Sequence, residues 1–175
     1  AGELMLAQLE LPPALVREAF AAQKAAGGAT MLNAAPALAV PGDLFALSDY
    51  LVLNETELAT YTDRALKADA PASVVKAAAL ELRRPGQKLI VTLGARGALA
   101  VDGRGALSIP ARAAQARDTT GAGDCFCGAL AARLAEGAAL TDSLEFAAAA
   151  AAISVTRDGA APSMPDRAEI DAALA

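Results

Sequence analysis

The chain has 175 residues, of which 55% are hydrophobic, and this is enough apolar material for one domain with a substantial core. Such a composition excludes a chain that stays disordered. The net charge is -5 and no block of lysines and arginines occurs, which disfavours nucleic-acid binding. Histidine is absent, so catalytic triads and metal sites built on histidine are excluded as well.

Two further features concern the cellular setting. No unbroken apolar run is long enough to span a bilayer, and no secretory signal is visible where the sequence starts, so we expect neither a membrane protein nor a secreted one. Cys125 and Cys127 stand close together in a predicted helix, where they point in different directions and are not expected to form a disulfide bond. We therefore expect a reducing, cytoplasmic location.

The first part of the chain predicts a strand–helix–strand unit. Residues 4–9 form a short apolar run that is typical of a buried strand. Residues 12–26 begin with two prolines and are followed by Gly27-Gly28, which is the pattern of a helix, and residues 29–32 indicate a second strand. A unit of this kind predicts a parallel sheet with a right-handed crossover.

Strands and helices continue to alternate along the middle of the chain. We expect a short helix over 43–48, a strand over 50–53, a helix from 54 towards 61, a loop over 65–70, a helix over 71–84 and a strand over 88–92. Residues 98–101 and 106–109 flank the segment Asp102-Gly103-Arg104-Gly105, which predicts a β-hairpin with the glycines serving its turn.

The last part is expected to be mainly helical after a short edge strand over 113–116. One helix starts around Asp124, and a second, capped by Thr141, runs through the six successive alanines 147–152. Small side chains let helices approach closely, so we expect these two helices to pack tightly together. A closing helix is expected over 165–174.

The most informative stretch is Asp118-Thr119-Thr120-Gly121-Ala122-Gly123-Asp124. Glycines allow backbone angles closed to other residues and let a ligand approach the main chain. The first N–H groups of a helix have no intrahelical partner and lie at the positive end of its dipole, so this turn is a ready phosphate site. Asp124 would repel that phosphate, and the simplest explanation is that it performs proton chemistry beside it. The alternative is a tight strand-to-helix turn with a solvated aspartate.

Other motifs stand at predicted strand ends. Ligands of open α/β sheets bind beyond the carboxyl ends of the strands, so Glu10, at the end of the first strand, is a candidate substrate contact; its alternative is a solvated strand-end acid. Asn54 and Glu57 face the same way on a first helical turn, and their alternative is a helix cap. The glycines of Thr92-Leu93-Gly94-Ala95-Arg96-Gly97 would let backbone lie against a nucleotide, unless they only serve a turn between strands.

Residues 118–124 resemble the signature of the ribokinase (PfkB) family of carbohydrate kinases at every position, and the other motifs recur in the family's order. The resemblance implies that Asp124 is the catalytic base and that the backbone of Gly121, Ala122 and Gly123 forms an anion hole for the transferring phosphoryl group. It implies a nucleotide site for ATP formed by Asn54, Thr92, Gly94, Gly97 and Gly123. It also implies that Glu10, in Gln8-Leu9-Glu10, contacts the sugar together with Asp124.

The same resemblance implies two metal ions. Glu57 would help to position Mg²⁺-bound phosphates largely through water, since magnesium prefers oxygen ligands and keeps several waters. A monovalent cation, often potassium, would be held largely by backbone carbonyls; the residues around it would be Asp118, Thr120, Ser154, Arg157, Gly159 and Ser163. The alternative for the segment from Arg157 to Pro165 is an ordinary proline-rich loop. Asn33-Ala34-Ala35-Pro36-Ala37 resembles a further family loop, with a departure at Ala34, and Asn33 is expected to satisfy backbone groups there.

The resemblance covers essentially the whole chain but only the later part of the family pattern. The first strands, the small lid and the di-glycine motif that grip the sugar have no counterpart here. It implies an α/β fold over 1–175 as a single domain: a three-layer αβα, Rossmann-like (ribokinase-like) arrangement with a mostly parallel sheet and a β-hairpin near residues 98–109. Either the natural protein is longer, or this piece pairs with another copy, as a homodimer, or with another subunit, because the missing strands would leave an unpaired sheet edge.

The expected function is ATP-dependent phosphorylation of a sugar primary hydroxyl, with ribose favoured. The partners would then be a small-molecule sugar and ATP. Fructose, a sugar phosphate or a nucleoside is the alternative substrate within the family. A non-catalytic nucleotide-binding or structural fragment without the sugar site is the alternative from another class.

Overall fold

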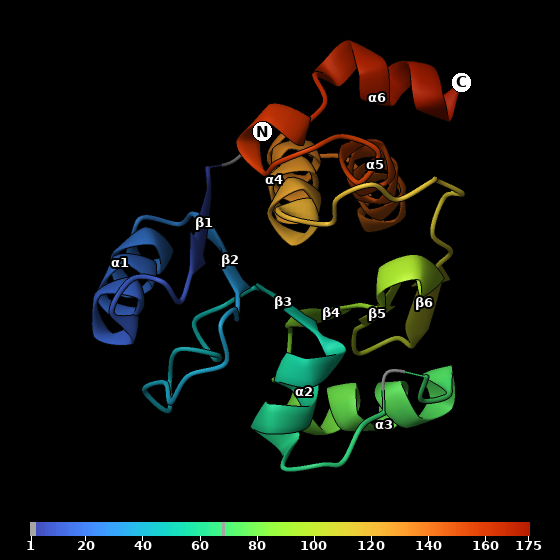
Figure 1. The fold of residues 1–175 in the computed structure, drawn as a ribbon. Coiled ribbons are helices and arrows are strands. Elements are labelled where there is room, and N and C mark those ends of the chain that lie inside the picture. Colours follow the sequence, from blue (N-terminus) through green and yellow to red (C-terminus); the bar gives the residue numbers. More distant parts are fainter. Residues whose placement is uncertain (1–2, 68) are drawn as a thin grey trace. The chain divides into compact units, whose positions relative to one another are not determined.

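The computed structural model describes residues 3–67 and 69–175. The expected loop over 65–70 is seen except at residue 68, which lies outside the described residues, as do residues 1 and 2 at the start of the chain. The elements are β1 (Leu4–Gln8), α1 (Pro13–Ala25), β2 (Ala29–Asn33), β3 (Tyr50–Asn54), α2 (Glu55–Thr62), α3 (Ala72–Leu82), β4 (Lys88–Thr92), η1 (Gly94–Arg96), β5 (Ala98–Val101), β6 (Ala106–Ile109), α4 (Ala122–Ala135), α5 (Leu140–Ser154), η2 (Ala161–Ser163) and α6 (Arg167–Leu174) (Figure 1).

These elements fall into two compact units, which are described separately. The sheet unit contains residues 3–93 and 99–108, and the helical unit contains residues 94–98 and 109–175. None of the described helices has the length and apolar character needed to cross a membrane.

The sheet has the strand order β1-β2-β3-β4-β5-β6, so every strand lies beside its neighbour in the sequence. The first four strands pair in parallel, with Leu32 of β2 opposite Leu51 of β3 and Leu51 opposite Leu89 of β4. β5 and β6 are adjacent and are joined by residues 102–105. The expected α/β fold with a mostly parallel sheet and a hairpin at this position is therefore confirmed.

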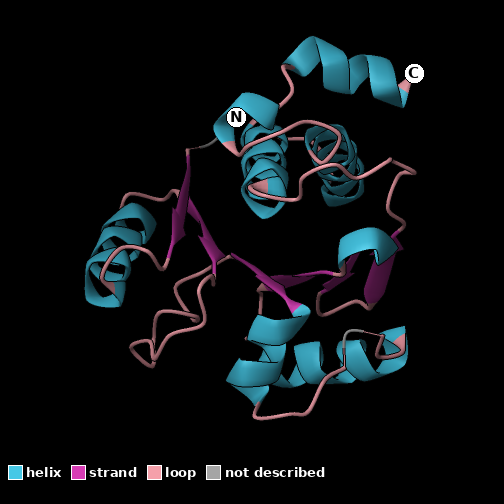
Figure 2. Ribbon diagram, viewed as in Figure 1, coloured by secondary structure: helices cyan, strands magenta, loops and turns pink. Residues whose placement is uncertain are grey.

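One apolar cluster holds the sheet unit together. Leu51 and Leu53 point to the same face of the sheet because alternate residues of a strand do so. Phe20 of α1, Leu58 of α2 and Val75 of α3 belong to the same buried cluster. The helices α1, α2 and α3 thus cover one face of the sheet, which successive right-handed crossovers between neighbouring strands require (Figure 2).

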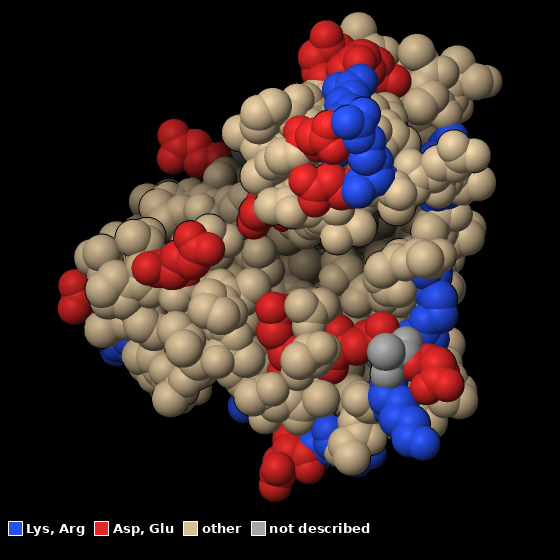
Figure 3. Space-filling model, viewed as in Figure 1, with Lys and Arg blue, Asp and Glu red and all other residues tan. Residues whose placement is uncertain are grey.

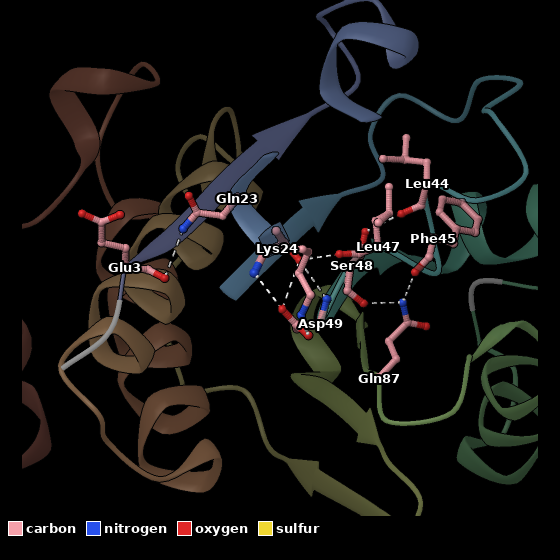
Figure 4. A network of polar contacts seen from close by, with 10 residues as sticks. Glu3, Gln23, Lys24, Leu44, Phe45, Leu47, Ser48, Asp49 and Gln87 are labelled. Atoms are coloured by element: carbon pink, nitrogen blue, oxygen red, sulfur yellow. Dashed lines mark hydrogen bonds and ion pairs between the residues drawn. The ribbon is translucent and has the colours of Figure 1, made fainter. Parts of the chain in front are cut away.

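The helix expected over 43–48 is wrong, because the structure has a run of turns there. A single α-type bond joins the N–H of Leu47 to the carbonyl of Asp43 at 3.0 Å. The buried side chain of Gln87 then donates from Nε2 to the carbonyls of Phe45 at 2.6 Å and Ser48 at 2.8 Å (Figure 4). These bonds tie the segment to the start of β4, so its backbone is fixed by a distant residue rather than by a continuing helix.

Asp49 completes the attachment of this loop to the sheet. Its Oδ2 accepts from the N–H of Thr30 at 2.9 Å, and its Oδ1 pairs with Lys24 Nζ at 2.6 Å (Figure 4). Thr30 Oγ1 also donates to the carbonyl of Leu47 at 2.6 Å. The connection between β2 and β3, which contains no helix, is therefore held by side chains of α1 and β2.

Two other local expectations need correction. The hairpin turn is closed by Asp102, whose Oδ1 accepts from the N–H groups of Arg104 at 2.7 Å and Gly105 at 3.0 Å, and neither of its glycines has a positive φ. Residues 113–116 form no strand. The chain that follows them is instead fixed by the carbonyl of Val155, which accepts from the N–H groups of the next two residues, 117 and 118, at 2.7 and 3.2 Å.

In the helical unit, α4 and α5 pack together as expected. Cys125 and Ala129 of α4, Ala149 and Ala150 of α5 and Ile170 of α6 belong to one apolar cluster. Both cysteines are buried and neither forms a disulfide bond in the described structure, as the spacing predicts. The small side chains at this interface allow the helices to approach closely.

The expected cap of α5 is wrong. The helix already begins at Leu140, so Thr141 lies inside it and the N-cap is Ala139, which makes no side-chain capping bond. Gly137, with φ +85°, follows the C-cap of the preceding helix, and α5 starts three residues later. The carbonyl of Ala139 accepts instead from the N–H and the hydroxyl of Ser143, at 3.0 and 2.8 Å.

Charged side chains bind α6 to the other two helices. The guanidinium groups of Arg133 and Arg167 lie over the ring of Phe146, 5.5 and 4.9 Å from its centroid. Both arginines also pair with Glu136, at 2.6 and 2.7 Å. Figure 3 shows basic and acidic side chains lying against each other over these helices.

Candidate functional site

The helical unit carries the glycine turn at the start of α4. Gly121 is the N-cap of this helix and has φ +75°, a left-handed conformation that favours glycine. A Cβ at this position would stand 3.0 Å from both Cα and Cβ of Ala160, so the turn also needs a residue without a side chain. The next residue but one, Gly123, is in open space, where a Cβ would meet nothing within 4 Å. The fold therefore explains the first glycine and leaves the second unexplained.

The N–H groups of this turn are not equivalent. Ala122 N–H donates to the carbonyl of Thr119 at 3.2 Å, and Cys125 N–H donates to that of Gly121 at 2.8 Å. Within the described part of the chain, the N–H groups of Gly121, Gly123 and Asp124 have no such acceptor. Three donors at the positive end of a helix are thus free for an anion, and the Asp124 N–H among them was missed by sequence reasoning.

Asp124 lies in the first turn of α4 and is exposed, as is Gly123, whereas Gly121 and Ala122 are half-buried. No hydrogen bond or ion pair of its carboxylate occurs among the described residues. An exposed carboxylate without a partner, placed next to free N–H donors, is able to accept a proton from a group brought to the same place. This is the arrangement that general base chemistry beside a bound phosphate requires.

Asp118 joins the segment before the turn to the loop after α5. Its Oδ1 accepts from the N–H and the hydroxyl of Thr120 at 2.9 and 2.7 Å, and its Oδ2 accepts from the N–H of Gly159 at 2.8 Å. Hydrogen bonds to the charged form, first from the Thr120 hydroxyl and then from the two N–H groups, lower the pKa of Asp118 to about 2. The structure thus brings Asp118, Thr120 and Gly159 together.

The other residues expected around a monovalent cation use their side chains elsewhere. Ser154 Oγ donates to the carbonyl of Ala151 at 3.1 Å, and Ser163 Oγ donates to that of Ala160 at 2.6 Å. The guanidinium of Arg157 is bonded to Glu169 of α6. A role of these residues at a cation would therefore rest on main-chain oxygens. No group of three or more Asp, Glu or Cys side chains able to hold a metal occurs among residues 3–67 and 69–175.

The two glycines of the segment after β4 differ in the same way as those of the turn. Gly97, with φ +95°, would place a Cβ 2.0 Å from the carbonyl oxygen of Ile109, so close backbone packing requires it to be glycine. Gly94, with φ +55°, faces open space. The left-handed conformation favours glycine at Gly94, but no neighbouring protein atom does, so a ligand has room to approach its main chain.

In the sheet unit, Asn54 and Glu57 form a capping box at the start of α2. Asn54 Oδ1 accepts from the Glu57 N–H at 2.9 Å, and Glu57 Oε2 accepts from the Asn54 N–H at 2.7 Å. Burial raises the pKa of Glu57, against the lowering effect of this N–H bond. The box leaves Nδ2 of Asn54 and Oε1 of Glu57 without a bond in the described part of the structure. Helix capping and ligand binding are therefore compatible at this pair.

Thr92 and Glu10 lie at the same edge of the sheet unit. Thr92, the last residue of β4, stands opposite Asn54 in the parallel register. Glu10 follows the end of β1 and is exposed. Because parallel strands end at a common edge, this edge collects Glu10, Asn54, Glu57 and Thr92. Asn33, at the end of β2, is 9% exposed, and its side chain makes no hydrogen bond with the described residues, so the expectation that it satisfies backbone groups is wrong.

Sequence reasoning missed one further residue of the helical unit, Glu169. It forms a capping box with Asp166 at the start of α6 and pairs with Arg157. The sequence Asp166-Arg167-Ala168-Glu169 carries the signal for the box, an N-cap residue followed at the third position by Glu. Nothing local marks the pairing with Arg157, because the two residues are brought together by tertiary structure.

Comparison with known proteins places this chain in a family. The model of the "pfkB family carbohydrate kinase" matches residues 1–167. Ribokinase of Schizosaccharomyces pombe is 40% identical over 174 residues, which cover 96% of this chain and 54% of that protein. Fructokinase-1 of Zea mays is 43% identical over 101 residues, which cover 52% of this chain and 31% of that protein.

A solved structure agrees over almost the whole chain. The structure of Arabidopsis thaliana ribokinase in complex with ribose and ATP matches this chain with a TM-score of 0.87 at 32% identity. The match covers 98% of this chain and 55% of that one. The chain thus spans about half the length of the ribokinases it matches. The matches to the family model, to the sequences and to the fold agree, and the chain belongs to the pfkB family of carbohydrate kinases.

Proposed function

We propose that the chain is the nucleotide-side portion of an ATP-dependent kinase that phosphorylates the primary hydroxyl of a sugar. The observation that carries the proposal is the turn at the start of α4, where free N–H donors lie next to an exposed carboxylate. Membership of the pfkB family supports it, and so does the likeness to a ribokinase that binds ribose and ATP.

In this proposal Asp124 acts as the base. Its carboxylate accepts the proton of the sugar hydroxyl as that oxygen attacks the γ-phosphorus of ATP. The bond to the oxygen bridging the β- and γ-phosphates breaks, and ADP leaves. The N–H groups of Gly121, Ala122 and Gly123 stabilise the charge on the γ-phosphoryl oxygens, and the Ala122 N–H must be shared with Thr119 to do so. Losing one such donor typically costs about 3 kcal/mol in barrier.

The nucleotide site in this proposal is the one that the family motifs imply. Gly94 and Gly97 would lie against the nucleotide, with Gly94 as the position that has space for a ligand. Asn54 and Thr92 would reach its phosphates from neighbouring strand ends. Phosphoryl transfer depends mainly on such positioning and on charge stabilisation rather than on covalent chemistry.

The residues present fit both cations. Glu57 Oε1 is a free carboxylate oxygen beside a fixed one, which suits Mg²⁺ taken up through water. Asp118 and the main-chain carbonyls of the loop around Gly159, which the Asp118–Gly159 hydrogen bond brings together, would supply oxygen atoms for a monovalent cation such as K⁺. When bound, Mg²⁺ would neutralise phosphate charge, and K⁺ would add positive charge beside the turn.

Ribose is the favoured substrate. Glu10 follows the first strand at the edge where substrates of α/β sheets bind. Among the substrates of the family, the segments Gln8-Leu9-Glu10 and Pro162-Ser163 favour ribose. Fructose, a sugar phosphate or a nucleoside is the alternative, and the similarity to a maize fructokinase favours the first of these. We infer a cytoplasmic location from the two buried cysteines, which form no disulfide bond in the described structure and so suit a reducing compartment.

A specific observation favours a second candidate function. The chain spans about half of the ribokinases it matches, so a non-catalytic nucleotide-binding or structural module without a sugar site is the alternative. A longer natural protein or a homodimer would each supply what this piece lacks.

Calorimetry with ADP and ATP, followed by ribose-dependent ATP turnover, tests the proposal. We expect nucleotide binding to the 175-residue chain, and turnover once the sugar-binding portion is present. In the active form, Asp124→Asn should retain nucleotide affinity and lose at least about a hundredfold in turnover, the usual weight of a general base. Asp142→Asn, in the first turn of α5, is the control. Binding without turnover in any form supports the non-catalytic module, and absence of nucleotide binding overturns the proposal.

A further inference from the structure

We propose that Arg157 and Glu169 are positioning residues, through which helix α6 holds the glycine turn at the start of α4 in place. This inference rests on the proposed function, because it assigns to the turn a ligand whose binding depends on the turn's position. Arg157 belongs to the proposed cation site through its main chain only, and its side chain has this separate role.

The first link joins α6 to the loop after α5. Glu169 is fixed at the start of α6 by the capping box, in which its N–H donates to Asp166 Oδ1 and its Oε2 accepts from the Asp166 N–H, both at 2.9 Å. Arg157 Nη1 donates to Glu169 Oε2 at 3.3 Å, and Nη2 donates to Oε1. Because two nitrogens meet two oxygens, the pair fixes direction as well as distance.

The second link joins that loop to the segment before the turn. Arg117 pairs with Asp158, the residue after Arg157. The N–H groups of Arg117 and Asp118 both donate to the carbonyl of Val155. Gly159 N–H donates to Asp118 Oδ2. The two segments are thus held together on both sides of Arg157, so a shift of one moves the other.

The third link reaches the turn itself. Asp118 Oδ1 holds Thr120 by its N–H and its hydroxyl, and Thr120 directly precedes Gly121. Gly121 packs against Ala160 so closely that a Cβ would stand 3.0 Å from its atoms. The turn therefore takes its position from residues 155–160, and those residues are tied to α6 through Arg157.

The ion pair also shifts the pKa values of both groups. Glu169 raises the pKa of Arg157, chiefly through the side-chain hydrogen bond, and Arg157 lowers the pKa of Glu169 in the same way. Both side chains are partly exposed, so we expect the pair to contribute little to the overall stability of the fold.

The test compares Arg157→Gln and Glu169→Gln with Asp171→Asn in the full chain. Asp171 lies on the same helix and pairs with Arg167, so its loss removes an ion pair of α6 that does not reach the loop. Glutamine at position 169 keeps an oxygen for the capping box. Hydrogen exchange of the bonded N–H groups of Thr120, Ala122 and Cys125 reports on the turn without any ligand, and calorimetry with ADP reports on its use.

We expect exchange of these three N–H groups to rise about fivefold in both test variants and to stay unchanged in Asp171→Asn, at equal unfolding midpoints. The dissociation constant for ADP should rise by a similar factor, and Arg157→Lys should recover part of the loss. Equal exchange in test and control variants overturns the positioning role. Failure of the parent chain to bind ADP overturns the proposed function instead, since the exchange experiment still decides this inference.

Discussion

The main-chain N–H of Gly159 donates to Asp118 Oδ2 at 2.8 Å, although the two residues stand 41 positions apart in the sequence. The bond joins the segment that leads into the glycine turn to the loop that follows α5. It also leaves Asp118 with three donors, two of them from Thr120. The ionised carboxylate of Asp118 thus connects the two segments through its hydrogen bonds, and its charge strengthens the bonds that hold the turn.

The pH dependence of the chain's stability should show the contribution of the Asp118 carboxylate. The three donors hold the pKa of Asp118 at about 2 in the folded chain, below the ordinary 3.8. Since the folded pKa is the lower one, the carboxylate contributes its full stabilisation above the unfolded pKa, and this contribution is lost as pH falls through about 2. Asp118→Asn should therefore lower the thermal midpoint near neutral pH, and the difference from the parent should shrink between about pH 4 and about pH 2.

Thermal unfolding followed by circular dichroism, without added potassium, measures this difference. Glu18→Gln, an exposed position on α1, is the control and should follow the parent at every pH. A midpoint difference for Asp118→Asn that stays constant down to about pH 2 would contradict the account of its hydrogen bonds.

Substitution of Gly123, the second glycine of the turn, distinguishes an effect on stability from an effect on nucleotide binding. Gly123 and Gly128 both lie in α4, are exposed and have open space at the Cβ position. Alanine at either site should keep or raise stability, by up to about 1 kcal/mol, because alanine is the better helix former. Only Gly123→Ala places a methyl group where a phosphate must approach the main chain, so it alone should weaken ADP binding, by about tenfold or 1.4 kcal/mol.

Unfolding midpoints and ADP titrations of the two variants, side by side, check this prediction. If both bind ADP equally well, the phosphate does not lie against Gly123, and the anion site at the start of α4 needs revision.

A third prediction concerns the loop before β3. Gln87 is 3% exposed and donates to two carbonyls of this loop, those of Phe45 and Ser48. Gln87→Ala removes both donors and should destabilise the chain by about 2–4 kcal/mol, since each buried group left without a partner costs about 1–3 kcal/mol. Asn33→Ala is the matched control, because that buried amide makes no hydrogen bond in the described structure, and it should cost about 1 kcal/mol or less.

Urea unfolding of both variants gives the two free energies of unfolding. A larger loss in the free energy of unfolding for Asn33→Ala than for Gln87→Ala would mean that the Gln87 hydrogen bonds drawn in Figure 4 do not hold this loop.

The sequence by itself determined the strands and helices whose signals are local. Apolar runs marked β1 and β4, prolines and glycines bounded α1, and the spacing of Asn54 and Glu57 carried the start of α2. The glycine turn and its acid were also recognisable, because the conformations that glycine allows and the free N–H groups of a helix start depend on neighbouring residues alone.

Tertiary structure decided everything that depends on a distant partner. Residues 43–48 carry a helical pattern, but Gln87 and Asp49 fix them as turns. The sequence could not tell that Ala122 shares its N–H with Thr119, that Gly97 is required by the backbone at Ile109, or that Arg157 turns its side chain to Glu169. Local conformation follows from the energies of adjacent residues, whereas hydrogen bonds between remote segments exist only once folding has repaid the entropy of bringing them together.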